Sequence, residues 1–198
     1  SNVGGVTSRL VKMGYRVLAV EPQSDISKKI PDNYKGATLL DMCVSNRAGE
    51  IDFYRAPMHQ LSSCYKKWNK YGPYKFKWEK KESVKCTTLD SLIKKYGVPS
   101  YIKIDVEGYE DKILDGLSTP PKCLSFEYTR NLRKKFVKSL NKVDSLGVSM
   151  YLMFHAMRQN KIKSVRVFSY ETTDECIRLY EKMDTDSAYK GDLFCIMK

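Results

Sequence analysis

The segment Ile102-Lys103-Ile104-Asp105-Val106-Glu107-Gly108-Tyr109-Glu110 carries the clearest strand pattern of the chain and ends among three acidic residues. Its first half lies in residues 101–106, the most strand-like run in the centre of the sequence, which predicts a strand. Its second half predicts a tight turn into a helix, because glycine tolerates turn conformations and acidic side chains suit a helix N-terminus. We therefore expect an α/β protein in which this strand ends at a ligand-binding edge of a parallel sheet.

Strand and helix patterns alternate on both sides of this segment. Apolar runs predict strands over residues 16–20, 37–44, 51–55, 101–106, 123–127, 150–154 and 193–197. Helical spacing and capping signals predict helices over residues 7–13, 89–96, 112–117, 131–146 and 173–183. This alternation predicts an α/β fold on a mostly parallel sheet, and without a long linker we expect one domain over residues 1–198.

The composition fits such a domain. Of the 198 residues, 42% are hydrophobic and 29% are charged, which excludes a disordered or collagen-like protein. No run reaches the ~18 apolar residues of a membrane-spanning helix and no secretory signal opens the chain, so we expect a cytoplasmic protein. Six cysteines without a C-x-x-C pair predict reduced thiols. A net charge of +12 suits an acidic or phosphorylated partner.

A glycine-rich turn and an acidic residue suggest a nucleotide-type cofactor. The opening stretch Ser1-Asn2-Val3-Gly4-Gly5-Val6-Thr7 leads into the first helix, where the backbone can approach an anionic ligand. Glu21 ends the strand over residues 16–20, a position from which an acid accepts hydrogen bonds from ribose hydroxyls. The turn alone is a weak signal, and a solvated carboxylate is the alternative for Glu21. Their combination, about 20 residues apart, is more specific.

Asp105, Glu107 and Glu110 crowd the end of the predicted central strand. Crowding raises the pKa of carboxyl groups unless a cation or a bound ligand compensates. A plain tight turn with acids at a helix start is the alternative. We favour a functional site, because several acids meet at the edge where parallel sheets bind ligands.

Residues 57–95 differ from the rest of the chain. They hold ten lysines and three acids, so 10 − 3 gives a local charge of +7, and their first part adds six aromatic residues. We expect residues 57–86 to form a basic aromatic flap over the site, since long ordered loops are usually functional. Such a flap suits an anionic acceptor or single-stranded RNA, and a solvated lysine face is the third alternative.

Seven motifs resemble the FkbM family of methyltransferases, in family order. They are Asn2-Val3-Gly4-x-x-Thr7, Gly14-Tyr15-Arg16-Val17-Leu18-Ala19-Val20-Glu21-Pro22, Val44-Ser45-Asn46-x-x-Gly49, Phe53-Tyr54, Thr88-Leu89-Asp90-Ser91-Leu92, Ile102 to Glu110, and Leu114-x-Gly116. The resemblance covers about residues 1–128. It implies S-adenosylmethionine-dependent methylation of a hydroxyl on a sugar, glycan or related small metabolite. It also implies a class I, Rossmann-like sheet with helices on both faces and an antiparallel last strand.

The resemblance also implies roles for individual residues. Cofactor contacts fall on Ser1, Asn2, Gly4, Thr7, Glu21, Pro22, Cys43, Val44 and Asp105. Within this set, the glycine turn borders the methionine moiety, Glu21 holds the ribose, and residues 41–45 lie near the adenine. The resemblance places Asp105 at the methyl-transfer centre and Glu107 and Glu110 at the substrate side or in the turn. By position, Asp105 is the expected catalytic base, and His155 and His59 are the alternatives. Lys66 and Trp68 of the flap are expected on the substrate side. A divalent metal at Asp105 and a neighbouring acid is an alternative that the spacing does not require.

One departure and two alternatives accompany this resemblance. The family motif starts with D-x-G-x-N-x-G on the central first strand, which is missing here, so we expect that strand to lie upstream of Ser1. A nucleic-acid methyltransferase, or a non-catalytic module that binds nucleic acid through its basic surface, are the alternative functions. The presence of Gly4, Glu21 and Asp105 argues against a module without catalysis, which needs none of them.

Overall fold

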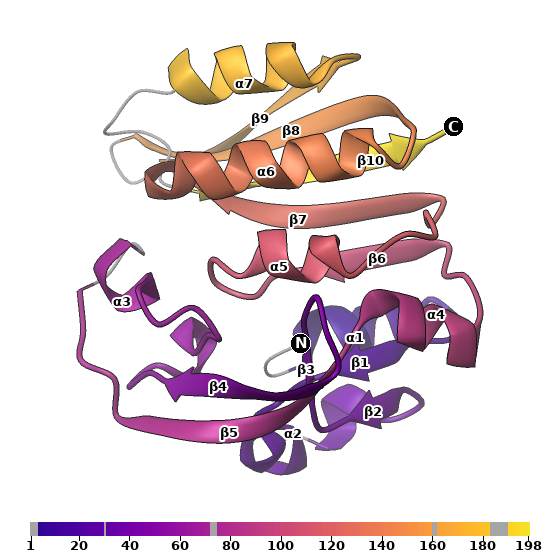
Figure 1. Ribbon diagram of the computed structural model, residues 1–198, viewed down its shortest axis with the longest axis vertical. Coiled ribbons are helices and arrows are strands. Elements are labelled where there is room, and N and C mark those ends of the chain that lie inside the picture. The colour runs from indigo at the N-terminus through magenta and orange to yellow at the C-terminus, as the bar shows by residue number, and fades with distance from the viewer. Residues whose placement is uncertain (1–3, 30, 72–74, 160–161, 183–189) are drawn as a thin grey trace.

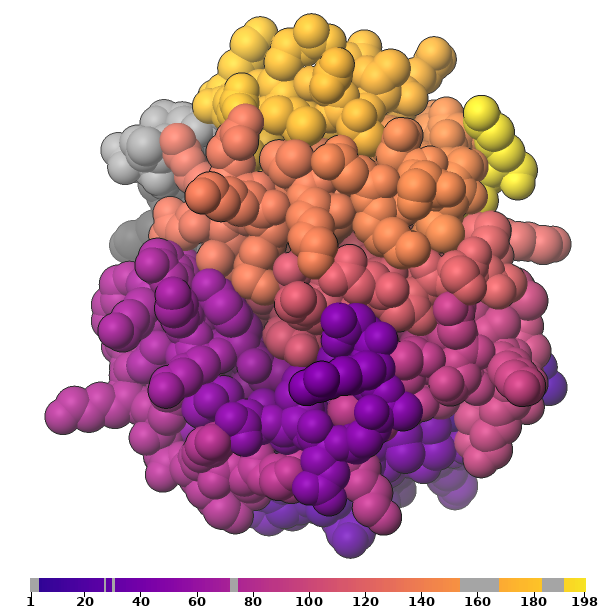
Figure 2. Space-filling model, viewed as in Figure 1, coloured from indigo at the N-terminus to yellow at the C-terminus, as the bar shows by residue number. Residues whose placement is uncertain are grey.

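The computed structural model describes residues 4–29, 31–71, 75–159, 162–182 and 190–198 (Figure 1). These residues form seven α-helices and ten strands in three sheets, a mixed α/β architecture. In Figure 2, the N-terminal half (indigo to magenta) occupies the lower part of the molecule, and the C-terminal half (orange to yellow) the upper part.

The N-terminal region forms a small parallel sheet with its helices. Its elements are α1 (Gly5–Lys12), β1 (Leu18–Val20), α2 (Ser24–Lys29), the 3-10 helix η1 (Pro31–Tyr34) and β2 (Thr38–Leu40). β1 pairs in parallel with β2, with Leu18 opposite Thr38. The predicted strand over residues 37–44 is divided: β2 joins this sheet, and β3 (Cys43–Val44) joins the next one.

A three-stranded sheet contains part of the expected flap. β4 (Gly49–Arg55) and β5 (Lys80–Thr87) are antiparallel, and β3 pairs in parallel with β5, which lies in the middle. The expectation of a continuous loop over residues 57–86 is therefore wrong for its last part. The exposed Lys81, Ser83 and Lys85 alternate there with the more buried Glu82, Val84 and Cys86. Period-two alternation suits a strand with one solvated face. The short helices η2 (His59–Leu61) and α3 (Trp68–Tyr71) occupy the first part.

The largest sheet has five strands in the order β6-β7-β10-β8-β9. The elements of this half are α4 (Leu89–Tyr96), β6 (Tyr101–Ile104), α5 (Glu110–Asp115), β7 (Cys123–Thr129), η3 (Arg130–Leu132), α6 (Arg133–Asp144), β8 (Val148–Gln159), β9 (Ile162–Tyr170), α7 (Thr173–Lys182) and β10 (Lys190–Met197). β6 and β7 are parallel, whereas β10 is antiparallel to both of its neighbours. The antiparallel last strand is confirmed, but the sheet is mixed rather than mostly parallel.

The main core lies between this sheet and the helices that follow its strands. Along β7, alternate residues Leu124, Phe126 and Tyr128 join the core, as period-two alternation requires. α5 contacts α6, and α6 contacts both β7 and α7, so these helices cover one face of the sheet (Figure 1). Ion pairs reinforce the packing of α5 on α6: Lys135 pairs with Asp111, and Lys138 with Asp115.

No helix in the described part of the chain is both long and apolar enough to cross a membrane.

We expect the fully buried Leu193 of β10 to contribute strongly to stability. Leu193→Ala leaves a cavity in the middle strand and should lower the free energy of unfolding by about 2–5 kcal/mol, measured by denaturant unfolding. The half-buried Leu152 of β8 is the matched control, and its alanine variant should lose less than half as much. Equal losses would contradict the placement of the core on the Leu193 face.

Candidate functional site

The turn after β6, residues 105–109, is called the acidic turn here and has an unusual backbone. Glu107 is the one non-glycine residue with a positive φ (55°) in the described chain, and Gly108 follows with a φ of 87°. A left-handed conformation is uncommon for a residue with a long side chain and indicates a local constraint. A Cβ on Gly108 would lie 2.9 Å from the Trp68 ring, so the turn also requires glycine for space.

Three carboxylates gather beside this turn. Asp105, Glu107 and Glu127 bring one oxygen each within 4.8 Å of one another, an arrangement that could hold a cation. Glu107 and Glu127 are buried, whereas the Asp105 side chain is 46% exposed. Lys103 offsets part of this charge, with its Nζ 3.6 Å from Asp105 and in contact with Asp192. Sequence reasoning missed Glu127, although an acid within the apolar run of β7 is a detectable signal.

The Glu110 side chain stabilises the turn through hydrogen bonds to its backbone. Its Oε1 accepts hydrogen bonds from the backbone N–H groups of Val106 (3.3 Å) and Gly108 (3.2 Å). Burial raises the pKa of Glu110 from 4.5 to about 8, and the negative charge of Glu127 adds to this effect. Of the two roles expected for Glu110, substrate contact and turn formation, this geometry matches the turn.

The first part of the flap holds the turn in place. The Ser63 hydroxyl donates to the carbonyl oxygens of Val106 (3.2 Å) and Glu107 (2.9 Å) and accepts from the N–H of Tyr65. Trp68 is fully buried, with its ring against Gly108. The ring therefore exposes no surface to an acceptor, which differs from the substrate-side position expected for Trp68. Ser63 carried no sequence signal, because the carbonyl oxygens that it binds lie more than forty residues away.

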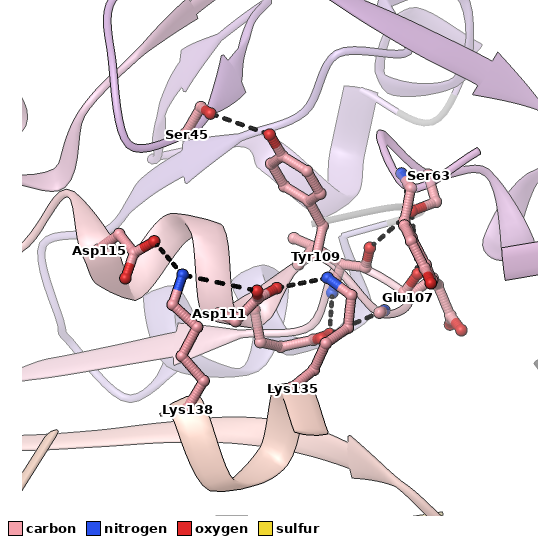
Figure 3. Close-up of polar contacts among 12 residues, drawn as sticks. Ser45, Ser63, Glu107, Tyr109, Asp111, Asp115, Lys135 and Lys138 are labelled. Carbon is pink, nitrogen blue, oxygen red and sulfur yellow. Dashed lines mark hydrogen bonds and ion pairs between the residues drawn. The ribbon is translucent and has the colours of Figure 1, made fainter. Parts of the chain in front are cut away.

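The helix after the turn contacts both halves of the molecule. The Tyr109 hydroxyl lies 3.2 Å from the Ser45 hydroxyl, as Figure 3 shows. Lys135 of α6 lies 4.3 Å from the centre of the Tyr65 ring and pairs with Asp111. Gly116 packs against the Ser45 carbonyl, where a Cβ would approach to 2.6 Å. The turn is thus fixed between the segment after β3 and helix α6.

Gly4 caps α1 in a left-handed conformation, with a φ of 73°. A Cβ here would lie 2.9 Å from the buried Tyr34 ring, so packing alone already requires glycine. Thr7 is buried one turn later. Ser1 and Asn2 lie outside the described residues. The expected cofactor contacts of Gly4 and Thr7 stay a prediction.

Glu21 lies at the end of β1 and is 97% buried, with a relative exposure of 3%. Its Oε1 accepts hydrogen bonds from the backbone N–H (3.0 Å) and the side-chain amide (3.3 Å) of Gln23. The Gln23 amide also donates to the His59 carbonyl oxygen (3.2 Å). Pro22 between them is half-buried. The carboxylate is therefore oriented, unlike the solvated strand-end acid that was the alternative.

Cys43 and Val44 form β3. The hydrogen bond with Cys64 and burial raise the pKa of the Cys43 thiol, and the nearby negative charge of Glu21 adds to this effect. The Cys43 Sγ lies 3.3 Å from the Sγ of Cys64. The structure thus brings the predicted ribose and adenine positions close together.

Residues 59–64 contact all three groups of predicted site residues. His59 accepts from Gln23 beside Glu21, Cys64 meets Cys43, and Ser63 binds the acidic turn. Through these contacts, the Glu21 side, the β3 side and the acidic side share one neighbourhood.

The remaining predicted residues lie at its margins. Lys66 is exposed, and its carbonyl oxygen accepts from the Trp78 indole N–H (2.9 Å). The Trp78 ring packs on Tyr54 and Phe76, with centroids 5.4 and 4.9 Å apart, and stays half-buried. His155 lies in β8 opposite Gly191, and its side chain is outside the described residues.

Stability should report the ionisation of Glu110. Because its pKa is raised from 4.5 to about 8 in the folded state, the folded protein binds more protons than the unfolded chain between these pH values. The free energy of unfolding should therefore fall as the pH rises through this window. Glu110→Gln keeps the acceptor oxygen without the ionisation, and should reduce the fall by more than about 1 kcal/mol.

Denaturant unfolding at pH 5 and pH 8 measures this difference, with the exposed Glu79→Gln as the control. Parallel pH profiles for wild type and Glu110→Gln would contradict the burial of an ionisable carboxyl at this position.

A comparison with protein families gives a direct match. The family model described as the methyltransferase FkbM domain matches residues 2–173, which is most of the chain. A search of curated proteins found none that matches this chain. FkbM methyltransferases use S-adenosylmethionine, and the family implies a Rossmann-like class I fold. The chain belongs to the FkbM family of S-adenosylmethionine-dependent methyltransferases.

Proposed function

We propose that this enzyme methylates a hydroxyl group on a sugar, glycan or related small metabolite. The observation that carries the proposal is the convergence of Glu21, Cys43 and the acidic turn on residues 59–64. Methyl transfer is an in-line displacement, so the protein mainly aligns the reacting groups. A hydroxyl nucleophile also needs a group that accepts its proton. We place both tasks in this neighbourhood, within one domain over residues 1–198.

The chain carries groups suited to the cofactor, which supplies the methyl group. Glu21 is oriented by Gln23, so its carboxylate is placed to accept hydrogen bonds from the ribose hydroxyls. Cys43 and Val44 lie beside it and provide the adenine side, with Pro22 next to Glu21. Gly4 and Thr7 at the start of α1 provide the methionine side, together with Ser1 and Asn2. We propose the family's class I arrangement, with helices on both sheet faces, as the frame for these contacts.

Asp105 is the proposed base. It is the most exposed carboxylate of the three that gather at the turn, so an acceptor hydroxyl can reach it. Glu107 and Glu127 beside it are buried, so Asp105 is the carboxylate of this cluster that faces solvent. Lys103 pairs with the Asp105 carboxylate. His155 is the second candidate for the base.

We propose an anionic acceptor that enters from the flap. Lys66 is exposed beside the half-buried Trp78, and Trp78 packs on Tyr54, whose neighbour Ser63 holds the turn. An indole next to a lysine suits a sugar ring that carries a phosphate or carboxylate group. Glu107 then borders the acceptor side of the turn. Phosphorylated and nucleotide-linked sugars are the first acceptors to test, with neutral sugars and a short RNA as comparisons.

Cofactor binding tests the role of Glu21. Glu21→Gln keeps the acceptor oxygen for Gln23 but loses the charge, and should weaken binding of S-adenosylhomocysteine ten-fold or more, or about 1.4 kcal/mol, by calorimetric titration. Glu171→Gln, at an exposed acid between β9 and α7, is the matched control and should bind within about two-fold of wild type. Equal affinities for wild type and Glu21→Gln would refute the ribose contact.

Asp105→Asn tests the base. With an acceptor from the panel and saturating cofactor, the variant should lose about 100-fold or more in kcat, measured as S-adenosylhomocysteine release. Asp192→Asn is the control, because Asp192 also pairs with Lys103. A comparable loss in both variants would show that the Lys103 ion pair, rather than proton transfer, is responsible. Retained activity after metal chelation would separate this mechanism from a metal-assisted one.

A further inference from the structure

Two cysteines that are distant in sequence lie in contact beside the proposed cofactor site. Cys43 is the first residue of β3, and Cys64 ends the 59–64 segment. Their Sγ atoms are 3.3 Å apart, and both thiols are free. A disulfide bond is about 2.0 Å long, so the two sulfur atoms need to approach by only about 1.3 Å.

The two thiols differ in accessibility. Cys43 is 94% buried, with a relative exposure of 6%, whereas Cys64 is half-buried. The hydrogen bond with Cys64, together with burial, raises the pKa of the Cys43 thiol well above its usual range. A reagent from solvent therefore meets Cys64 first, and Cys43 is positioned behind it as the second thiol.

A third cysteine nearby is engaged elsewhere. Cys86 lies opposite Cys43 in the parallel pairing of β3 with β5. Its thiol donates a hydrogen bond to the Arg47 carbonyl oxygen, at 3.2 Å. This contact favours Cys64 over Cys86 as the partner of Cys43.

We propose that Cys43 and Cys64 form a reversible disulfide site whose reaction partner is a small-molecule disulfide. The Cys64 thiolate attacks one sulfur of the reagent, forms a mixed disulfide and releases the first thiolate. Cys43 then loses its proton, and its sulfur attacks the Cys64 sulfur and displaces the second thiolate. Two protein thiols are oxidised to one disulfide, and the reagent is reduced to two thiols.

The bond would join strand β3 to the segment that holds the acidic turn. Ser63, next to Cys64, donates to the carbonyl oxygens of Val106 and Glu107. Cys43 lies two residues before Ser45, which contacts Tyr109. Oxidation would therefore link the two segments whose residues Ser45 and Ser63 contact Tyr109 and the acidic turn. The proposal concerns only these thiols and does not depend on the acceptor or on catalysis.

Peptide mapping tests the proposal. The full chain is treated with oxidised glutathione at mildly alkaline pH, alkylated, and digested with trypsin without reduction. Each cysteine falls on a separate tryptic peptide, with Cys43 in residues 36–47 and Cys64 in residues 56–66. We expect a cross-link between these two peptides that dithiothreitol reverses. We also expect the oxidised chain to melt about 3 °C or more above the reduced chain, because the bridge restricts the unfolded state.

Single variants provide the controls. Cys64→Ser should abolish both the cross-link and the melting shift, whereas Cys86→Ser and Cys123→Ser should retain them. Three results would overturn the proposal: a bridge that includes Cys86, Cys64 left as a mixed disulfide with glutathione, or no modification of Cys64. An unchanged melting shift in Cys64→Ser would overturn it as well.

Discussion

Residues 59–64 contact three segments that belong to or follow strands β1, β3 and β6. The His59 carbonyl oxygen, the Ser63 hydroxyl and the Cys64 thiol contact Gln23, the acidic turn and Cys43, respectively. Buried polar groups need such partners, because an unpaired one is unfavourable by about 1–3 kcal/mol. Ser63 alone satisfies two carbonyl oxygens of a turn that contains a left-handed glutamate. The geometry of the site therefore depends on a segment that contributes no proposed catalytic group.

The site combines a cluster of carboxylates with a protein whose net charge is positive. The protein carries a net charge of +12, yet three carboxylates gather beside the turn with Lys103 as a nearby cation. Under the proposed function, the acidic interior suits the positively charged sulfonium of the cofactor, and the lysines around it attract an anionic acceptor. The buried Glu110 stays out of this balance at neutral pH, because its raised pKa favours the neutral form.

Local signals predicted most of the fold, whereas long-range contacts determine the site. Helix α4 begins and ends where the sequence indicates, because Thr88 caps it and Gly97 follows with a positive φ. Strand β9 was missed although its run of Ile, Val and aromatic residues is typical of strands. Glu21 and Asp105 were predicted from their places after strands. The role of Ser63 was not predictable, since its hydroxyl binds backbone atoms that any sequence provides.

The order of strands in the large sheet affects how the protein is made. β10 is the middle strand of the sheet, yet the ribosome synthesises it after β6, β7, β8 and β9. During translation, the pair β6-β7 and the pair β8-β9 must therefore wait with unpaired edges facing each other. Exposed strand edges can pair with other chains. The pairing of β10 with β7 joins residues distant in sequence, and contacts of this kind form slowly. The sheet therefore becomes continuous only when β10, the last strand of the chain, pairs with β7 and β8.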